Sequence, residues 1–160
     1  MTGVPVAIAL GSNLGDREGQ LREAGIRLRG FLDGLCLSAF LETDPVDVEP
    51  QPRFLNAAGI GRTQLTARAL LDRLLQIEQS FGRVRPAPGA PRTLDLDLIL
   101  YGDAIIDEPG LIVPHPRFRG REFVLAPLVT IAPEWRDPVT GKTMRELLDG
   151  VPRWPALPET

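Results

Sequence analysis

Two aspartates, Asp95 and Asp97, stand one residue apart in the apolar segment PRTLDLDLILY at residues 91–101. On a β-strand, residues i and i+2 point to the same face, so the two carboxylates project together, about 7 Å apart at a rise of roughly 3.3 Å per residue. The same alternation turns four leucines toward a core: Leu94, Leu96, Leu98 and Leu100. Paired carboxylates suit Mg²⁺, which prefers oxygen ligands and often shares one or two carboxylates with substrate phosphates. A solvent-facing strand surface is the simpler alternative, and a bare Asp-x-Asp pattern does not exclude it.

Basic residues near these acids favour a site for phosphate. Arg83, Arg85 and Arg92 precede them, and the segment VPHPRFRGREF at residues 113–123 adds the chain's one histidine, His115, together with Arg117, Arg119 and Arg121. Acids that hold magnesium and arginines that hold phosphate oxygens are the parts of a phosphoryl-transfer site. No GxxxxGK[ST] segment occurs, which excludes a P-loop enzyme. Taken alone, His115 would be a structural histidine, and Arg117 and Arg119 would be solvated charges.

The elements that must position these residues follow from hydrophobic periodicity and turn signals. We expect strands at residues 4–10, 35–41, 54–63 and 94–101, and helices from Asp16 to about Leu32 and from 67 to 81, with Asp16 and Thr66 as N-caps. A short hairpin arm near Ile105–Ile106 and a helix near Met144–Leu148 complete the chain. Two long loops, 43–53 and 82–92, are rich in proline. The order strand–helix–strand, strand–helix–strand predicts an α+β fold, a ferredoxin-like α/β sandwich with a largely antiparallel sheet, helices on one face and the other face left for the two loops and for ligands.

Composition limits the class of protein. The 160 residues are 43% hydrophobic, which suits one folded domain spanning residues 1–160. Cys36 is the one cysteine, so we expect a reducing, cytoplasmic setting without an intrachain disulfide. No apolar stretch approaches the roughly 20 residues of a membrane span. A net charge of −3 and 6% aromatic residues argue against the rival hypothesis of an RNA-binding ferredoxin-like module, so we expect no nucleic-acid or membrane partner, and a monomer.

Several segments together resemble one enzyme family. In order and spacing, ALGSNLGD, ETDPV, FLNA, GRVR, PRTLDLDLILYG and VPHPRFRGREFVLAPL are similar to 6-hydroxymethyl-7,8-dihydropterin pyrophosphokinase of folate biosynthesis. The resemblance runs from about Val6 to Pro133, and PRTLDLD followed by VPHPR is its most specific part. It implies a ferredoxin-like fold and the transfer of pyrophosphate from MgATP to the pterin hydroxymethyl group, with release of AMP. ATP is then the co-substrate, and two Mg²⁺ ions are the cofactors.

The resemblance also implies roles for individual residues. Asp95 and Asp97 would bind the two magnesium ions, and Arg83 and Arg92 would close on the triphosphate as catalytic residues. The remaining nucleotide contacts would come from Arg85, Leu98, His115 and Arg121. The pterin would be bound by Thr43, Val46, Phe54, Asn56 and Phe123, with the two phenylalanines stacking on its faces. Taken without the resemblance, Phe54 and Phe123 would be plain core residues.

One departure from the family pattern supports a second rival hypothesis. Many members have Trp-Gly-Pro-Arg where this chain has Gly89-Ala90-Pro91-Arg92, so the loop lacks a tryptophan that closes over the substrates. An inactive paralogue that only binds pterin or nucleotide would be consistent with that loss. The presence of both acids and of Arg92 argues for an active enzyme.

Overall fold

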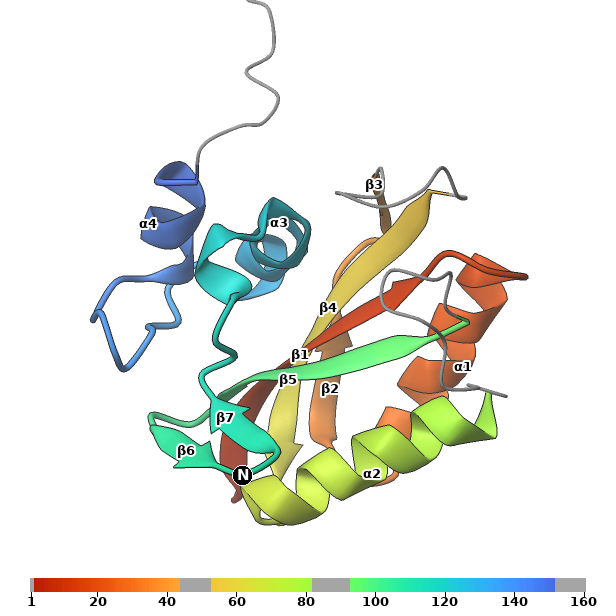
Figure 1. The fold of residues 1–160 in the computed structure, drawn as a ribbon, viewed down its shortest axis with the longest axis horizontal. Helices are drawn as coiled ribbons and strands as arrows, with labels where there is room; N and C mark the ends of the chain where they lie inside the picture. The colour runs from red at the N-terminus through yellow and green to blue at the C-terminus, as the bar shows by residue number, and fades with distance from the viewer. Residues whose placement is uncertain (1, 44–52, 82–92, 152–160) are drawn as a thin grey trace, which may run out of the picture.

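A five-stranded antiparallel sheet forms the centre of the structure, a computed structural model that describes residues 2–43, 53–81 and 93–151 (Figure 1). Its strands are β1 (Val4–Ser12), β2 (Asp33–Leu37), β3 (Leu41–Thr43), β4 (Phe54–Thr63) and β5 (Asp95–Tyr101). They lie in the order β2-β4-β1-β5, and β3 pairs with β4 on the same side as β2. All of these pairings are antiparallel, as expected for the ferredoxin-like order.

Helices α1 (Arg17–Leu28) and α2 (Ala67–Ser80) cover one face of the sheet, here called the first face (Figure 1). Both predicted N-caps are confirmed. The Asp16 side chain accepts a hydrogen bond from the Gly19 N–H, and Thr66 accepts one from the Ala69 N–H, which satisfies amides that a helix start leaves without partners. The core between these helices and the sheet is almost entirely aliphatic and includes Val6, Ile8, Leu10, Leu21, Leu28, Leu70, Leu74, Leu94, Leu96 and Leu98. Each fully buried leucine of this kind contributes about 1.5–3 kcal/mol through burial.

The opposite, second face is partly covered, which corrects the expectation that it is left to loops and ligands. Helices α3 (Glu122–Ile131) and α4 (Met144–Asp149) pack on one half of it (Figure 1). Their core includes Ala7, Ala58, Ile99, Leu100, Phe118, Leu125, Leu128 and Met144. α3 was missed because it contains Pro127 and is apolar on most sides, so it shows no amphipathic stripe. The predicted helix near Met144 is confirmed, and Thr143 and Glu146 form a capping box at its start.

A β-bulge breaks the predicted alternation in β5. The register against β1 runs from Ile8↔Leu98 directly to Ala7↔Leu100, so Ile99 is an extra residue on β5. Leu94, Leu96 and Leu98 face the first core as predicted, whereas Leu100 packs in the second core together with Ile99. The bulge therefore lets one strand supply both cores.

Two boundaries also differ from the sequence-based expectation. α1 ends at Leu28 instead of continuing to Leu32, because the N–H groups of Gly30 and Phe31 bond the carbonyls three residues back, Arg27 and Leu28, in a tighter 3₁₀-type turn. The expected strand 35–41 is divided into β2 and β3. Between them, Ser38 bonds Ala58 through its backbone N–H and again through its hydroxyl, which accepts the Ala58 N–H.

The chain after β5 forms the expected hairpin arm. Strands β6 (Ile106–Glu108) and β7 (Leu111–Val113) pair across a turn at Pro109–Gly110, where Gly110 has the positive φ of 75° that glycine tolerates. A short 3₁₀ helix, η1 (Phe118–Gly120), leads into α3. Within the described ranges, no helix has the length and apolar character to cross a bilayer.

Candidate active site

Polar side chains gather on the half of the second face that α3 and α4 leave uncovered. Asp95 pairs with Gly11 of β1, and Gly11 pairs with Asn56 of β4. Directly opposed residues in antiparallel strands share a face, so Asp95 and Asn56 lie on the same surface with only a glycine between them. In the next row, Asp97 pairs with Ala9. Gly11 has no side chain and Ala9 has only a methyl group. The surface between the two acids and the Asn56 amide is therefore low, and this surface is called the low floor below.

Asp95 and Asp97 are partly exposed, while the leucines beside them are buried, as predicted. Their oxygens are the donor type that Mg²⁺ prefers. Among the described residues, no group of three or more His, Cys, Asp or Glu side chains forms a complete metal site. The two carboxylates therefore fit magnesium that takes its remaining ligands from water and substrate phosphates, which is its usual mode of binding at phosphoryl-transfer sites.

Asn56 is held in a fixed orientation at the other end of this row. Its side chain is only 6% exposed, and Nδ2 donates a hydrogen bond of 2.5 Å to the Thr43 hydroxyl on β3. A Cβ added to Gly11 would lie 3.2 Å from the Asn56 Oδ1 and 4.0 Å from the Phe54 ring, so the glycine allows the amide and the ring to approach β1. The structure thus brings Thr43, Phe54 and Asn56 together, as the resemblance implies.

Phe123 enters from α3, which contacts both β3 and β4. The ring lies in the first turn of that helix and packs against the second core. The Arg121 guanidinium carbon lies 5.5 Å from the centroid of this ring, a cation–π contact that fixes the arginine at the junction between η1 and α3. Phe123 is therefore partly buried against the second core, and its role in pterin binding stays a prediction.

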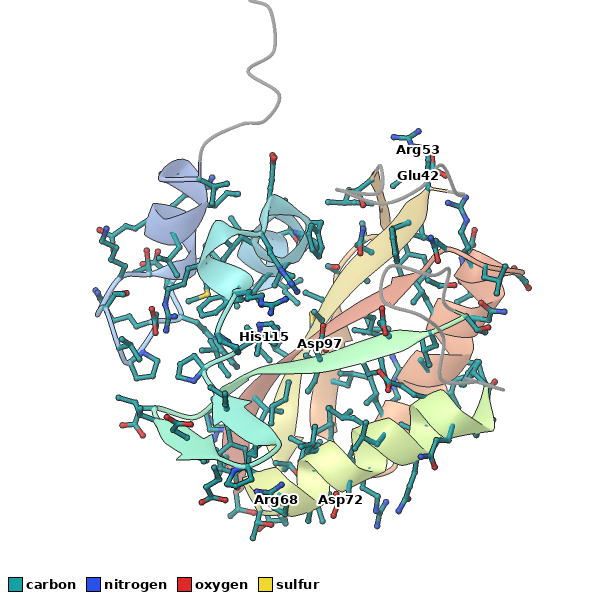
Figure 2. The ribbon with its side chains drawn as sticks, in the orientation of Figure 1. Glu42, Arg53, Arg68, Asp72, Asp97 and His115 are labelled. Atoms are coloured by element: carbon teal, nitrogen blue, oxygen red, sulfur yellow. The ribbon has the colours of Figure 1, made fainter. Side chains whose placement is uncertain are left out.

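His115 lies beside β5, and in the view of Figure 2 its label stands near that of Asp97. Its backbone N–H donates to the Ile99 carbonyl at 3.0 Å, while Nδ1 of the ring accepts the Arg117 N–H at 3.1 Å. Burial lowers the pKa of His115 to about 4, with further lowering by the positive charges of Arg121 and Arg117. The ring is therefore neutral at pH 7, and its proton sits on Nε2, because Nδ1 is an acceptor. This makes it a neutral hydrogen-bond donor near the acids.

Arg119 is not the solvated charge that its sequence context suggested. Its Nε and Nη2 bind both oxygens of Asp137 at 2.5 and 2.9 Å, and Asp137 is fully buried. Asp137 also accepts the Val139 N–H and the Thr140 hydroxyl. Burial alone would raise the pKa of Asp137, but the hydrogen bonds from Arg119, Val139 and Thr140 and the charge of Arg119 together lower it, so the pair stays charged. Arg119 thus fixes η1, and with it the histidine segment, to the chain after α3.

Leu98 is 5% exposed and its side chain belongs to the first core. A role in ligand binding can come only from its backbone. Leu96 donates its N–H away from β1, to a side chain on α2. Backbone groups in an antiparallel strand alternate in direction, so the N–H and C=O of Leu98 also turn to the outer edge of β5.

Two clusters beside the site were missed in the sequence. The Gln20 amide lies 2.9 Å from the Ser12 hydroxyl and from the carbonyls of Leu14 and Thr93, so α1 ties the end of β1 to the residues just before β5. Glu42 accepts hydrogen bonds from Arg17 and Arg53 at 2.6 and 2.9 Å, and Arg17 also donates to the Arg53 carbonyl. The hydrogen bond from Arg17 lowers the pKa of Glu42. These partners are far apart in the sequence, so no local sequence pattern predicts their contacts.

Four of the predicted site residues lie outside the described ranges: Val46, Arg83, Arg85 and Arg92. In sequence, the segments that carry them, 44–52 and 82–92, precede β4 and β5. Their roles remain predictions.

Comparison with known proteins identifies the family. Residues 7–133 match the family model of 7,8-dihydro-6-hydroxymethylpterin-pyrophosphokinase. The chain belongs to this family. The pyrophosphokinases are diphosphotransferases that move pyrophosphate from ATP to the pterin hydroxymethyl group in folate biosynthesis, so the family and reaction class predicted from the sequence are confirmed.

Individual relatives agree with this assignment. The chain is 42% identical over 149 residues to the Bacillus subtilis 2-amino-4-hydroxy-6-hydroxymethyldihydropteridine pyrophosphokinase, a match that covers 92% of this chain and 88% of the relative. It is 47% identical over 112 residues to the Synechocystis pyrophosphokinase, with 68% of this chain and 57% of that enzyme covered. A match of 49% over 131 residues to the mitochondrial folate synthesis bifunctional protein of Arabidopsis thaliana covers 79% of this chain and only 23% of that longer protein.

Solved structures confirm the fold. A crystal structure of an HPPK-DHPS protein in complex with substrates superposes with a TM-score of 0.75 at 12% identity and covers 93% of this chain and 43% of that one. A Plasmodium falciparum HPPK-DHPS structure gives a TM-score of 0.71 at 14% identity, covering 92% and 44% of the two chains. At 12% and 14% identity, the superpositions show only that this chain has the ferredoxin-like fold of these proteins.

Proposed function

We propose that this chain transfers the β,γ-pyrophosphoryl group of ATP to 6-hydroxymethyl-7,8-dihydropterin on the uncovered half of its second face. The observation that carries the proposal is the row Asp95–Gly11–Asn56 across three neighbouring strands. At a strand spacing of roughly 4.8 Å, its two polar ends are about 10 Å apart along the backbone. A pterin ring held at Asn56 would therefore direct its hydroxymethyl group toward phosphates held at Asp95 and Asp97.

The pterin half of the site is supported by the preorganised Asn56. Its amide is fixed by Thr43 and faces the low floor at Gly11, which suits a flat heterocycle with donors and acceptors along one edge. Phe54 and Phe123 supply aromatic surface from β4 and α3 for the two ring faces. Val46 would complete this half from the segment before β4.

The nucleotide half is supported by His115, Arg121 and the outer edge of β5. The neutral imidazole donates from Nε2 and the guanidinium supplies a permanent charge, and both suit phosphate oxygens. The backbone of Leu98 offers an N–H and a C=O at an open strand edge, which can pair with the edge of an adenine. Arg83, Arg85 and Arg92 would add positive charge from the segment before Asp95.

The chain's residues position the reactants more than they supply covalent chemistry. The pterin hydroxymethyl oxygen attacks the β-phosphorus of ATP, a new oxygen–phosphorus bond forms, the bond to the α-phosphate oxygen breaks, and AMP leaves while the hydroxyl proton passes to solvent. Asp95 and Asp97 would hold two magnesium ions, which neutralise phosphate charge and lower the pKa of a bound hydroxyl. We further propose that residues 1–160 act as a single monomeric domain in the cytoplasm, where ATP is available.

An assay of the products tests the proposal. Purified protein with ATP, magnesium and 6-hydroxymethyl-7,8-dihydropterin should form AMP and the pterin diphosphate in equal amounts. Omission of the pterin, or removal of magnesium by a chelator, should stop AMP formation. Formation of ADP, or tight pterin binding without any AMP, would contradict the proposal, and the latter result would identify an inactive paralogue.

A further inference from the structure

Glu78, near the end of α2, is a buried carboxylate on the side of the sheet opposite the proposed site (Figure 1 shows α2 along that face). It is 4% exposed and belongs to the apolar stripe of its helix, together with Leu74 and Ile77. A buried carboxylate is costly unless hydrogen bonds compensate for the lost water. Packing alone therefore does not account for an acid at this position.

The carboxylate binds the backbone of the strand that carries Asp95 and Asp97. Oε2 of Glu78 accepts the Leu96 N–H at 2.7 Å, and this bond is buried. Leu96 is the residue between the two aspartates. A backbone N–H that is buried without an acceptor is costly, so this hydrogen bond stabilises the position of Leu96.

The position of β5 in the sheet makes this hydrogen bond important for holding the strand in place. In the described sheet β5 is an edge strand that pairs with β1 on one side only. On its outer edge the Leu96 N–H is held by Glu78, and the Ile99 carbonyl is held by the His115 N–H. Leu96 and Ile99 lie on either side of Asp97, and Leu96 directly follows Asp95. The two hydrogen bonds therefore limit how far the Cα atoms of both aspartates can move.

We propose that Glu78 is a positioning residue for the magnesium site: through its hydrogen bond to Leu96 it fixes the spacing and direction of Asp95 and Asp97. The proposal rests on the proposed function, in which these two acids hold magnesium. In this role Glu78 acts through the backbone of β5. The residues that orient metal ligands typically change metal affinity or activity by about ten- to a hundredfold when they are removed.

Two substitutions separate the hydrogen bond from the charge and from packing. Glu78→Gln keeps a carbonyl oxygen that can accept the Leu96 N–H but removes the charge, whereas Glu78→Met keeps most of the volume and removes the acceptor. Ile77→Ala is the matched control, because Ile77 is the neighbouring residue of α2, is 6% exposed and packs in the same core. Three quantities are measured in each variant: hydrogen exchange of the Leu96 amide without ligands, the magnesium concentration that half-saturates AMP formation, and pterin affinity.

The hydrogen-bond role predicts a specific pattern. Glu78→Gln should retain protection of the Leu96 amide and a magnesium requirement near that of the wild type. Glu78→Met should lose that protection and raise the half-saturating magnesium concentration by about ten- to a hundredfold. Ile77→Ala should lower the melting temperature and leave the magnesium requirement unchanged, since it makes a cavity without freeing β5. A magnesium requirement in Glu78→Met close to the wild-type value, or one in Glu78→Gln raised as much as in Glu78→Met, would overturn the proposal.

Asp97→Asn, measured in parallel, distinguishes this failure from failure of the proposed function. A changed magnesium requirement in Asp97→Asn with no change in Glu78→Met overturns the positioning role alone. An unchanged requirement in Asp97→Asn overturns the metal site, and the positioning role with it.

Discussion

The two faces of the sheet use the same strands for different purposes. On β5, Leu96 is 3% exposed and packs beneath α2, whereas Asp97, the next residue, is partly exposed on the other side. On β1, Leu10 belongs to the first core and its neighbours Ala9 and Gly11 form the low floor of the site. Large apolar side chains thus alternate with small or polar ones. Substitutions on the first face should therefore change stability, and substitutions on the uncovered second face should change activity.

The largest expected effect is on the second face. Asp97→Asn should lower kcat/KM at least a thousandfold, about 4 kcal/mol of transition-state stabilisation, because a neutral amide holds magnesium poorly. The melting temperature should not fall, since two carboxylates on one face repel each other without metal. AMP formation and thermal unfolding are measured together, with the exposed acid of β6, Asp107→Asn, as the control. Retention of more than about a tenth of the activity, a barrier change below about 1.4 kcal/mol, would contradict the role of Asp97.

A first-face substitution should show the reverse pattern. Leu74 is fully buried, so Leu74→Ala should lower the free energy of unfolding by about 3 kcal/mol through lost burial and a cavity. The KM for each substrate should stay near the wild-type value in protein that remains folded. Leu75, the next residue, is 43% exposed, and Leu75→Ala serves as the control with an expected loss below about 1 kcal/mol. Urea denaturation and steady-state kinetics decide between the patterns, and a large rise in KM for Leu74→Ala would show that the faces are coupled.

The aromatic part of the site should affect one substrate only. Phe54→Ala should weaken pterin binding by about 1–2 kcal/mol, from lost stacking and contact area. Affinity for ATP with magnesium should change little, because Phe54 lies at the Asn56 end of the row. Calorimetric titration of each ligand separately measures both values. Equal losses for both ligands would indicate a damaged core instead of a lost pterin contact.

The smallest expected effect concerns the charge of His115. Its pKa in the folded protein, about 4, is below the ordinary value of 6.5. As the pH falls, His115 therefore takes up a proton at a higher pH in the unfolded chain than in the folded protein. The contribution of the neutral ring to stability is therefore fully present above pH 6.5 and declines as the pH falls toward 4. Because the ring is only partly buried, solvent screening reduces the effect to about 1 kcal/mol. Denaturant midpoints at pH 7 and 5 should differ more in the wild type than in His115→Gln, and equal differences would show that His115 titrates normally.

The sequence predicts those parts of the fold that depend on local signals. Asp16 and Thr66 were identified as caps because capping involves residues three positions apart, and Asp95 and Asp97 share a face because alternation is local. The bulge at Ile99 depends on the register of two strands far apart in sequence, so alternation alone placed Leu100 in the wrong core. α3 was missed because a helix buried on most sides has no stripe to detect.

Some features of the site could likewise be predicted from the sequence, and others could not. The family motifs led to Thr43, Asn56 and His115, but the hydrogen bonds of Asn56 to Thr43 and of His115 to Ile99 depend on pairings that the motifs do not encode. The neutral state of His115 follows from burial and from two arginines that fold against it, and composition does not show it. For Glu78 a signal was present, since an acid on the apolar stripe of α2 is unusual, but its partner on β5 was visible only in three dimensions.

The bond between Arg119 and Asp137 has a consequence for where this domain can be cut. The family match ends at residue 133, four residues before the buried carboxylate that holds the histidine segment in place. A protein shortened to the matched region would keep all the aspartates, arginines and aromatic rings assigned to substrates. It would nevertheless lose the support behind His115 and the α4 side chains Met144 and Leu147 that pack in the second core. The smallest unit able to fold with a competent nucleotide site is therefore larger than the unit that defines the family by sequence.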